Sequence, residues 1–485
     1  HVILKNLDTS FQKIDELPFD FERRRMSVIV KDDSNVVSMV TKGALEEMLT
    51  ISTHVEYRGE IIPITEDIRQ EVLAEVGQLN RQGLRVLGVG YKSGLREDYA
   101  YAVTDESDMI LTGYLAFLDP PKPSAAPAIQ ALLEHGVKTK ILTGDNEKVT
   151  QAICEKVGLD VEHILLGADI DQMTDQELAE AVESVTVFAK LSPDQKARII
   201  LQLKKNGHAV GYMGDGINDA PSMKVSDVGI SVDTAVDIAK ETADVILLDK
   251  DLMVLETGIV EGRKVYANMT KYIKMTVSSN FGNIFSLLVA SIFLPFLPMA
   301  PVHLIVLNLV YDLSCVALPF DNVDQDFLKQ PHTWEAKSIT RFMVWMGPIS
   351  SFFDILTFIF LYFIIVPLVT GHHYVHGSES ALQFIILFQT GWFIESMWSQ
   401  TMVIHMLRTA KVPFVQSRPA WLVILTTLVA AIFVTSLPYG PLVNILRLAP
   451  LGLPYFLFLT LIIFLYMISV TTIKNFYIKK YKEWL

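Results

Sequence analysis

Residues 211–221, GYMGDGINDAP, place two carboxylates and one amide in a glycine-rich turn straight after an apolar-leaning stretch. These side chains are Asp215, Asn218 and Asp219. Glycines let a ligand approach the backbone closely, and the exposed N–H groups of a following helix attract phosphate oxygens. Carboxylates beside a phosphate are favourable when a metal ion such as Mg2+ lies between them. The segment therefore predicts a turn that binds Mg2+ and phosphate.

A second acidic turn occurs earlier in the chain, at Thr143, Gly144 and Asp145 in the stretch ILTGD. Lys196, in SPDQK, is available as a cation that faces phosphate oxygens. Either turn alone would be explained by Asp and Asn in an ordinary loop. We expect both turns at the end of one parallel sheet, and this combination favours a phosphate and metal site.

A parallel sheet is expected to position these residues, and residues 128–249 have its pattern. Helix-like stretches such as PDQKARIILQLKKNG alternate with short apolar strands, and glycines follow the helices. This alternation is typical of βαβ units. Open α/β sheets bind ligands at the carboxyl ends of their strands, where both acidic turns lie.

The second half of the chain is too apolar for a soluble protein. Of all residues, 51% are hydrophobic, and beyond about residue 264 long stretches are almost uncharged. Segments of about 20 apolar residues can cross a bilayer as helices. Six spans are predicted, at residues 272–297, 302–320, 342–369, 382–406, 421–437 and 455–473. The sequence therefore divides into a soluble part and a membrane part.

Charge determines the expected orientation and excludes some partners. The connector between the fourth and fifth spans contains Arg408, Lys411 and Arg418, and several lysines follow the sixth span. Because cytoplasmic loops are enriched in Lys and Arg, the soluble part and the C-terminus are expected in the cytoplasm. The net charge of -13 argues against a nucleic-acid partner. Cys154 and Cys315 lie far apart, so neither a disulfide framework nor a thiolate metal site is expected.

Polar residues within the predicted spans are costly in hydrocarbon and therefore carry information about function. Four of them pair on helix faces by spacings of three and four residues: Asn280 with Asn283, and Asn308 with Asp312. Hydrogen bonds between helices would explain the asparagines, whereas the carboxylate of Asp312 favours an ion path. Oxygen ligands of this kind suit Mg2+ or Ca2+. Asp354 and Glu395 are weaker candidates, for the same role or a structural one.

Together the motifs resemble those of the P-type ATPases, which are cation pumps built on a haloacid-dehalogenase-like domain. The resemblance rests on ILTGD, DPPK, SPDQK and MGDGINDAPSMKVSDVGI, and it extends along essentially the whole chain. It implies a haloacid-dehalogenase-like parallel sheet and an α+β nucleotide-binding domain, followed by an α-helical membrane domain of six spans. The implied domains are residues 1–115 for nucleotide binding, 116–260 for phosphorylation and 261–485 for the membrane.

The resemblance also implies roles in phosphoryl chemistry. The phosphoryl group would be held, and its hydrolysis positioned, by Thr143, Gly144, Asp145 and Lys196. Asp215 would ligate the catalytic Mg2+, with Asn218 and Asp219 in support. Neutralising the dispersed charge of a phosphoryl group is the physical reason for these residue types.

A nucleotide site is implied nearer the N-terminus. Phe19 would stack on the base of ATP, Lys42 and Arg85 would meet its phosphates, and Asp119 in DPPK would touch the ribose. Taken alone, the stretch FERRRMS at residues 21–27 is more typical of a basic solvated face.

One segment expected of a P-type ATPase does not occur in the sequence. DKTGT, which carries the aspartate that becomes phosphorylated, is absent, as are a TGES-type loop and the first four membrane spans. We expect that this chain is the C-terminal portion of a longer pump, or that its upstream part was lost. By itself it is expected to be inactive.

The predicted ion follows from the first two spans and their exit. SSNFGNIFSLLVASIFLPFLPM and LNLVYDLSCVALPFDNVD resemble the bacterial magnesium-transporting members, which bring Mg2+ into the cytoplasm. Asn283 stands where calcium pumps usually carry a glutamate, which leaves Asp312 as the single carboxylate. We expect ATP-driven Mg2+ transport across the bacterial inner membrane through an aspartyl-phosphate. The alternatives are a calcium or proton pump, a membrane-anchored phosphatase, and a nucleotide-binding fragment without catalysis.

Overall fold

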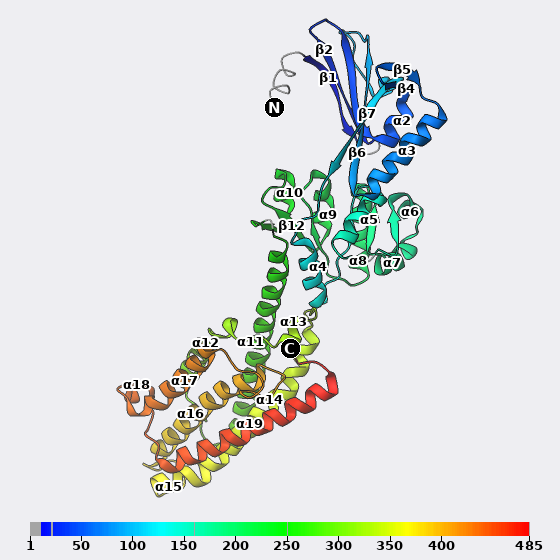
Figure 1. Cartoon of the computed structure of the whole chain (residues 1–485). Coiled ribbons are helices and arrows are strands. Elements are labelled where there is room, and N and C mark those ends of the chain that lie inside the picture. The colour runs from blue at the N-terminus through cyan, green and yellow to red at the C-terminus, as the bar shows by residue number, and fades with distance from the viewer. Residues whose placement is uncertain (1–10, 21–22, 160, 250, 485) are drawn as a thin grey trace. The chain divides into compact units, whose positions relative to one another are not determined.

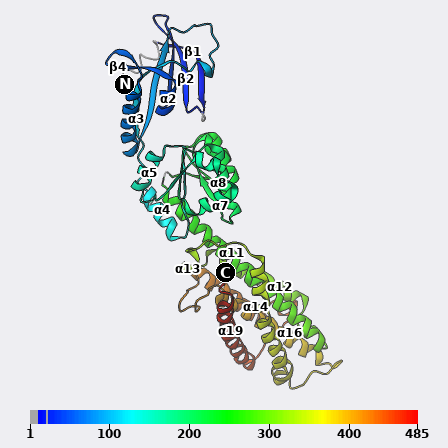
Figure 2. The same cartoon turned by 90° about the vertical axis from the view of Figure 1, so that its right-hand side faces the viewer.

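The computed structural model describes residues 11–20, 23–159, 161–249 and 251–484. The chain forms two compact units, His1–Leu133 with Lys138–Glu256, and Glu134–Val137 with Thr257–Leu485. Among the described residues, all strands belong to the first unit, and the second unit is helical (Figures 1 and 2). The predicted order, an α/β part followed by a helical part, is therefore confirmed.

A seven-stranded sheet forms the N-terminal part of the first unit. Its strands pair in the order β1-β2-β3-β6-β7-β4-β5, antiparallel except for β4 with β7. The strands are β1 Phe11–Asp20, β2 Arg25–Asp32, β3 Val37–Ala44, β4 Ser52–Tyr57, β5 Glu60–Pro63, β6 Leu84–Ser93 and β7 Met109–Leu118, with η1 at Val103–Asp105. Helices α2 (Leu45–Ile51) and α3 (Glu66–Arg81) pack on one face of the sheet, where Met48 and Val76 are buried.

Two three-stranded parallel sheets follow, in the orders β8-β10-β9 and β11-β12-β13. The strands are β8 Ile141–Leu142, β9 Ile164–Leu166, β10 Val187–Ala189, β11 Gly211–Met213, β12 Val228–Val232 and β13 Val245–Leu247. The helices are α4 Ala125–Glu134, α5 Glu147–Lys156, α6 Gly167–Gln172, α7 Asp175–Ser184, α8 Pro193–Lys205, α9 Ala220–Val225 and α10 Asp237–Thr242, with η2 at Ile217–Asp219. The predicted parallel strands are thus present.

The expectation of one continuous parallel sheet is corrected to two sheets. Among the described strands, β8 pairs only with β10, and β11 pairs only with β12. Each of the two acidic turns therefore follows an edge strand whose other side has no partner. The two sheets are nonetheless neighbours, because Leu142 and Val210 pack against the hydrophobic clusters of both.

The second unit is a bundle of long helices. Its elements are α11 Met253–Phe293, α12 Pro301–Cys315, η3 Leu318–Phe320, α13 Gln325–Leu328, α14 Ala336–Phe360, η4 Leu361–Ile365, α15 Val366–Thr370, α16 Ala381–Leu407, α17 Trp421–Ser436, η5 Leu437–Tyr439, α18 Val443–Leu446 and α19 Leu453–Tyr481. In the described part of the chain, five helical stretches are long and apolar enough to cross a membrane. They coincide with five of the six predicted spans.

The remaining predicted span, 382–406, is helix α16, which is not among those five stretches. Of its 27 residues, 19 are buried, and they include Glu395, Gln400 and His405. Helices α12, α14, α17 and α19 all pack against it. A helix enclosed by other helices does not face lipid and can carry polar residues. A sixth span therefore stays a prediction.

A buried ionic network joins three segments of the bundle. The carboxylate of Asp321, which follows η3, is fully buried and accepts hydrogen bonds from Lys271 Nζ at 2.9 Å and Arg408 Nε at 2.8 Å. The backbone N–H of Ala420 donates to its other oxygen. Lys271 belongs to α11 and Arg408 ends α16, so this one carboxylate holds both helices against the segment after α12.

Candidate functional site

The GDGIND turn follows β11 and folds back on itself through Asp219. Asp219 Oδ1 accepts hydrogen bonds from Lys196 Nζ at 2.9 Å and from the hydroxyl of Tyr212 at 2.7 Å. Its Oδ2 accepts from the backbone N–H of Gly216 at 3.3 Å. A Cβ at Gly214 would overlap the side chain of Asp219. Glycine is therefore required at 214 for the turn to close in this way.

The two aspartates of this turn have different electrostatic environments. Burial raises the pKa of Asp219, but the hydrogen bonds and charge of Lys196 and the Tyr212 hydroxyl outweigh it and hold the pKa below its usual range. Burial, with Asp219 beside it, raises the pKa of Tyr212. Asp215 is exposed, and its carboxylate has no hydrogen-bond or ion-pair partner within the described residues. Asp215 is thus free to bind a metal ion, whereas Asp219 is committed to Lys196.

Tyr212 was not predicted as a site residue. Its neighbours in GYMGD marked a strand, and an aromatic residue in a strand is most often part of the core. The structure shows that its ring is buried while its hydroxyl reaches Asp219. Asn218 lies in η2, partly exposed, between the two aspartates.

The sequence SPDQK begins α8 and thereby places Lys196. Ser192 is the N-cap, with its Oγ accepting from Gln195 N, and the Gln195 side chain accepts in return from Ser192 N. Pro193 occupies the first turn, where its missing N–H costs nothing. Lys196 lies in this capped first turn of α8. Its ammonium therefore reaches Asp219, which lies in the turn after β11 of the neighbouring sheet.

The second acidic turn, Thr143 to Asp145, follows β8. Thr143 N donates to Phe188 O of β10 at 3.0 Å, and Asp145 N donates to Thr143 Oγ1 at 3.1 Å. Gly144 is exposed. Asn146 then caps α5 through Lys148 N. The turn therefore presents a hydroxyl, an exposed backbone and a carboxylate just before a helix N-terminus, which suits phosphate oxygens.

The two turns are not joined directly. No hydrogen bond or ion pair between the described residues links Thr143–Asp145 to the GDGIND turn. Each turn lies at the carboxyl end of an edge strand. The structure therefore assembles Lys196 with Asp219 and leaves Asp145 in a separate cluster.

The nucleotide candidates share one face of the seven-stranded sheet. Lys42 pairs with Val89 across β3 and β6, so Arg85, four residues before Val89, lies on the same face about 13 Å away. That face is opposite to α2 and α3, and its side chains Leu87 and Leu115 are 37% and 55% exposed. This leaves an exposed, partly apolar surface with cations near it.

One of these candidates, Arg85, already has protein partners, whereas an ATP site without ligand would leave its guanidinium available for phosphates. Arg85 Nη2 donates to Asp145 Oδ2 at 2.7 Å, and its Nη1 lies 3.4 Å from Asp119 Oδ2. Phe19, at the end of β1, is half exposed, as is typical of a side chain that can stack on a ligand. Lys42 is exposed. The nucleotide roles of these residues stay predictions.

Within the basic stretch at residues 21–27, of which 21 and 22 lie outside the described residues, Arg23 and Arg25 do not belong to a solvated face, so that interpretation is wrong for these two arginines. Arg23 Nη1 and Arg25 Nε lie 2.6 and 2.8 Å from the carboxylate of Glu106, which is fully buried. The hydroxyl of Ser27 donates to the same carboxylate. Burial raises the pKa of Glu106, but these donors outweigh it and hold the pKa below its usual range. The pairing spans about 80 residues of sequence, so no local pattern could reveal it.

The predicted ion ligands lie on α11 and α12. Asn280, Asn308 and Asp312 are exposed, and Asn283 is half buried. In the described part of the chain, none of these four side chains makes a hydrogen bond or ion pair. Hydrogen bonding between helices, the alternative explanation for the asparagines, is therefore not what holds them here. The helices present their oxygen atoms on an uncovered face.

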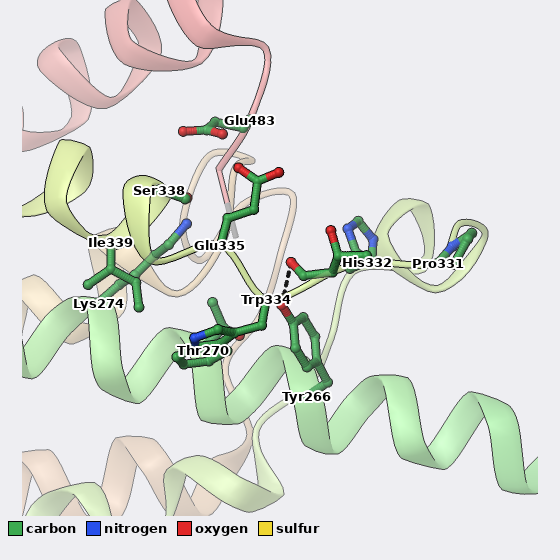
Figure 3. A pocket seen from close by; sticks show the side chains of 11 residues that line it. Tyr266, Thr270, Lys274, Pro331, His332, Trp334, Glu335, Ser338, Ile339 and Glu483 are labelled. Atoms are coloured by element: carbon green, nitrogen blue, oxygen red, sulfur yellow. Dashed lines mark hydrogen bonds between the residues drawn. The ribbon is translucent and has the colours of Figure 1, made fainter. Parts of the chain in front are cut away.

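A cavity of about 220 Å³ lies beside α11 and the start of α14, and Figure 3 shows its lining. Glu335 and Glu483 border one side, and the hydroxyl of Tyr266 donates to Thr333 O on the other. None of the predicted site residues lines it. This cavity is therefore separate from both candidate sites.

Comparison with known proteins identifies the family. Residues 2–124 match the family described as P-type ATPase, cytoplasmic domain N, and residues 296–476 match the one described as cation transporting ATPase, C-terminus. The chain belongs to the P-type cation ATPases. Its fold agrees with the family: an α/β unit and a helical unit whose described part contains five stretches long and apolar enough to cross a membrane.

Magnesium-transporting P-type ATPases are similar over nearly the whole chain. The magnesium-transporting ATPase, P-type 1, of Salmonella typhimurium strain LT2 is 50% identical over 98% of this chain and 52% of its own length. The protein of the same name from Escherichia coli K12 is 49% identical with the same coverage. A calcium-transporting ATPase of Bacillus subtilis strain 168 is 33% identical over 67% of this chain and 37% of its own. The chain thus spans about half the length of the magnesium-transporting relatives.

The residues of this P-type ATPase can be tested for their fit to a catalytic Mg2+. Asp215 offers an unpartnered carboxylate at the end of β11. Mg2+ typically binds through one or two carboxylates together with substrate phosphates and water, without a cage of many protein ligands. The described residues contain no group of three or more metal-binding side chains. One free carboxylate, in the turn that Lys196 contacts through Asp219, fits this ion.

Proposed function

We propose that this chain is the nucleotide-binding, phosphoryl-transfer and membrane portion of a Mg2+-transporting P-type ATPase. The observation that carries the proposal is the cluster of Lys196, Asp219 and Tyr212 beside the unpartnered Asp215. An anion-binding lysine fixed by one carboxylate, next to a second carboxylate left free, is what phosphoryl transfer with Mg2+ requires. The names of the relatives support Mg2+ as the transported ion.

The residues of this chain would act by positioning and charge stabilisation. Asp215 would hold Mg2+, which neutralises phosphoryl oxygens when bound. Lys196 would contact the same oxygens, with its ammonium oriented by Asp219. Thr143 and Gly144 would bind the phosphoryl group through the hydroxyl and the exposed backbone, and Asp145 would help to position water for hydrolysis. Arg85, which is paired with Asp145 and Asp119 here, would exchange these partners for ATP phosphates.

The nucleophile would come from an upstream part of the same pump. An aspartate carboxylate there would attack the γ-phosphorus of ATP, and ADP would leave with the electrons of the broken P–O bond. Within the described part of the chain the outer edges of β8 and β11 are unpaired. This supports the arrangement, since a strand placed between them would bring such an aspartate to both acidic turns.

The transported ion would bind at the oxygen-rich face of α11 and α12. Asn280, Asn283, Asn308 and Asp312 offer amide oxygens and a single carboxylate. Mg2+ gives up its water reluctantly, so a site with one charge that binds a partly hydrated ion is suitable, whereas a calcium site more often contains several carboxylates. Arg408, Lys411 and Arg418 support a cytoplasmic position for their loop and the α/β unit, in a bacterial inner membrane.

The test is acid-stable labelling of the complete pump with γ-labelled ATP. We expect label that hydroxylamine removes, as from an acyl phosphate. Asp215→Asn should lose the label while still binding ATP. Asp237→Asn, which removes an exposed carboxylate at the start of α10, is the matched control and should keep it.

Three results decide the assignment. Label that survives in Asp215→Asn would refute the role of this turn. Absence of label from the complete pump, with ATP bound, would refute the phosphoryl chemistry. ATP hydrolysis that is stimulated by Ca2+, and not by Mg2+ above the concentration that catalysis requires, would refute the magnesium pump and favour a calcium pump.

A further inference from the structure

A buried carboxylate beside the seven-stranded sheet has no role in the proposed function. The side chain of Glu106, which follows η1, is fully buried. Its Oε2 accepts hydrogen bonds from Arg23 Nη1 at 2.6 Å and Arg25 Nε at 2.8 Å, and its Oε1 accepts from the Ser27 hydroxyl at 2.7 Å. Desolvation offsets much of the attraction in a buried ion pair, so such a pair is weak evidence for a role in stability. The geometry that Glu106 imposes on its neighbours is therefore a better guide to its role.

One neighbour of Glu106 is an irregular stretch in the pairing of β1 with β2. Regular pairing stops and resumes at two residue pairs, which are Leu17 with Ser27 and Asp20 with Arg25. Pro18 and Phe19 therefore both lie opposite Met26, and two residues opposite one form a β-bulge. β1 is an edge strand, where proline is tolerated. Bulges are common at sheet edges and beside active sites, where they change the direction of a side chain.

The bulge determines the face of the sheet on which Phe19 lies. In a regular strand alternate residues share a face, so Phe19 would lie with Leu17, which is buried in a hydrophobic cluster. The bulge instead places Phe19 opposite Met26, and the Phe19 side chain is 50% exposed. Met26 pairs in turn with Lys42. Phe19 therefore shares a face with Lys42, two strands or about 10 Å away.

Arg23 connects this bulge to the buried carboxylate. Its Nη1 donates to Glu106, while its Nη2 donates to the carbonyl oxygen of Pro18 at 2.8 Å. Its backbone N–H donates to Asp20 Oδ1 at 2.9 Å. The planar guanidinium of arginine presents its donors in a rigid fork, which the single ammonium of lysine does not. Glu106 therefore fixes the guanidinium, and the guanidinium fixes the backbone directly before Phe19.

Arg25 binds the same carboxylate and does not contact the bulge in this way. Its guanidinium donates to Glu106, and it makes no other side-chain hydrogen bond within the described residues. Ser27, the third donor, also shares a hydrogen bond with the hydroxyl of Thr41 in β3. These two contacts hold β2 and β3 to the segment after η1. Arg23 extends the cluster to the bulge in β1.

The face that carries Phe19 has the features of a nucleotide surface. An exposed aromatic ring can stack on a base of any kind, since every base has a π-face. Lys42 is exposed on the same face and offers a cation to the nucleotide. Both depend on the direction of Phe19, because a ring turned to the other face would be separated from Lys42 by the sheet.

We propose that Glu106, acting through Arg23, is a positioning residue that aims Phe19 at the base of ATP. The proposal rests on the proposed function, in which this part of the chain binds nucleotide. Glu106 itself does not touch the nucleotide. Its partner Ser27 alternates with Met26 along β2, so the carboxylate and Phe19 lie on opposite faces of the sheet.

The first test measures equilibrium binding of labelled ATP to the complete pump without Mg2+. Phe19→Ala should weaken binding by about 5- to 150-fold, the loss expected for a stacked base. Arg23→Lys keeps a cation beside Glu106 and cannot hold the Pro18 carbonyl at the same time. It should weaken binding about 2- to 10-fold, as for one lost hydrogen bond. Arg25→Lys is the matched control, since it makes the same change against the same carboxylate, and it should bind ATP like the wild type.

A double-mutant cycle separates positioning from a general effect on folding. Glu106→Gln keeps the shape of the side chain and removes its charge. If Glu106 acts through Phe19, this substitution should weaken ATP binding in the wild type and have no further effect in Phe19→Ala. During ATP hydrolysis, the KM for ATP should rise in Glu106→Gln while kcat at saturating ATP stays unchanged.

The outcomes distinguish this proposal from the proposed function. Equal weakening by Glu106→Gln with and without Phe19 would show that Glu106 acts on the fold alone and would overturn the proposal. Unchanged binding in Phe19→Ala would overturn it as well and leave the pump intact. No ATP binding by the wild-type pump would refute the proposed function itself. If Glu106→Gln does not fold, Arg23→Lys replaces it in the cycle, and an Arg23→Lys that binds ATP like Arg25→Lys would overturn the proposal.

Discussion

Replacing Asp321 by Asn is expected to destabilise the helical unit, because two buried cations depend on this carboxylate. Lys271 and Arg408 have side chains that are each 1% exposed, and both lie within 2.9 Å of Asp321 Oδ2. Asn keeps the shape of the side chain and removes its charge. Breaking a buried ion pair by removing one partner costs about 3–5 kcal/mol, since the other charge stays buried.

A loss of that size is measurable by thermal unfolding in detergent. In a domain of about 150–250 residues, 1 kcal/mol corresponds to roughly 2–4 °C in Tm, so the expected decrease is about 6–20 °C. Intrinsic fluorescence near neutral pH provides the readout. Asp326→Asn, whose exposed carboxylate pairs with Lys411, is the matched control and should leave Tm unchanged. If Asp321→Asn behaves like this control, the two cations do not depend on Asp321 and the reasoning fails.

The same carboxylate gives a dependence on pH. Burial raises the pKa of Asp321, but Lys271 and Arg408 outweigh it and hold the pKa below its usual range. The folded-state pKa is therefore lower than the unfolded value of about 3.9. The stability that Asp321 contributes is present above that value and is lost as the pH falls through the folded-state pKa. The difference in Tm between wild type and Asp321→Asn should shrink in this acid range, and a difference that grows there would contradict the assignment.

Three further predictions concern the candidate sites. Gly214→Ala should reduce labelling by γ-labelled ATP about 100-fold by displacing Asp219, whereas Gly258→Ala, with nothing within 4 Å of the new Cβ, should label normally. Tyr212→Phe removes a donor to a charged group, which contributes about 1.5–3 kcal/mol. The pKa of Asp219 should rise and the acid limb of the pH profile of ATP hydrolysis should move to higher pH, and an unmoved limb would refute the contact. Asp312→Ala should abolish Mg2+ transport with nucleotide binding intact, and transport that persists would place the ion elsewhere.

Local patterns in the sequence predicted the elements that depend on local chemistry. The helix predicted at PDQKARIILQLKKNG is α8, and adjacent residues, Ser192 and Gln195, form the capping box that begins it before Lys196. The parallel strands followed from their alternation with helices. The sequence could not show that Asp215 is exposed while Asp219 is paired with Lys196. That difference depends on where Lys196, which belongs to another helix, lies in the fold.

Features that depend on distant residues were not predictable in the same way. Arg23 and Arg25 stand in a basic run, yet their partner Glu106 follows about 80 residues later. The polarity of α16 has a similar origin, since residues such as Gln400 are tolerated where neighbouring helices enclose them. Hydropathy measures how a helix would interact with lipid and does not register such shielding. The length of the apolar stretch in α16 therefore cannot decide whether this helix crosses the membrane as the sixth predicted span.

Two uncovered surfaces, one on helix α12 and one at the edges of β8 and β11, both support the proposed contact with an upstream part of the pump. Asn308 and Asp312 are exposed on a helix that is apolar enough to cross a membrane, and a carboxylate that faces lipid is strongly unfavourable. Among the described strands, the outer edges of β8 and β11 lack partners, and an open edge presents unpaired N–H and C=O groups that can pair with another strand. In our proposal, the upstream part of the pump supplies helices to the first surface and a strand to the second.

This proposal predicts that the two parts can assemble as separate chains. An upstream segment of a complete pump, co-expressed with this chain, should co-purify with it, and γ-labelled ATP should label the upstream chain. Because Asp215 would hold the metal ion for the transfer, Asp215→Asn in this chain should remove label from the other chain. Co-purification should persist, since Asp215 lies outside both uncovered surfaces. Label on an upstream chain that is expressed without this chain would show that this chain takes no part in the phosphoryl transfer.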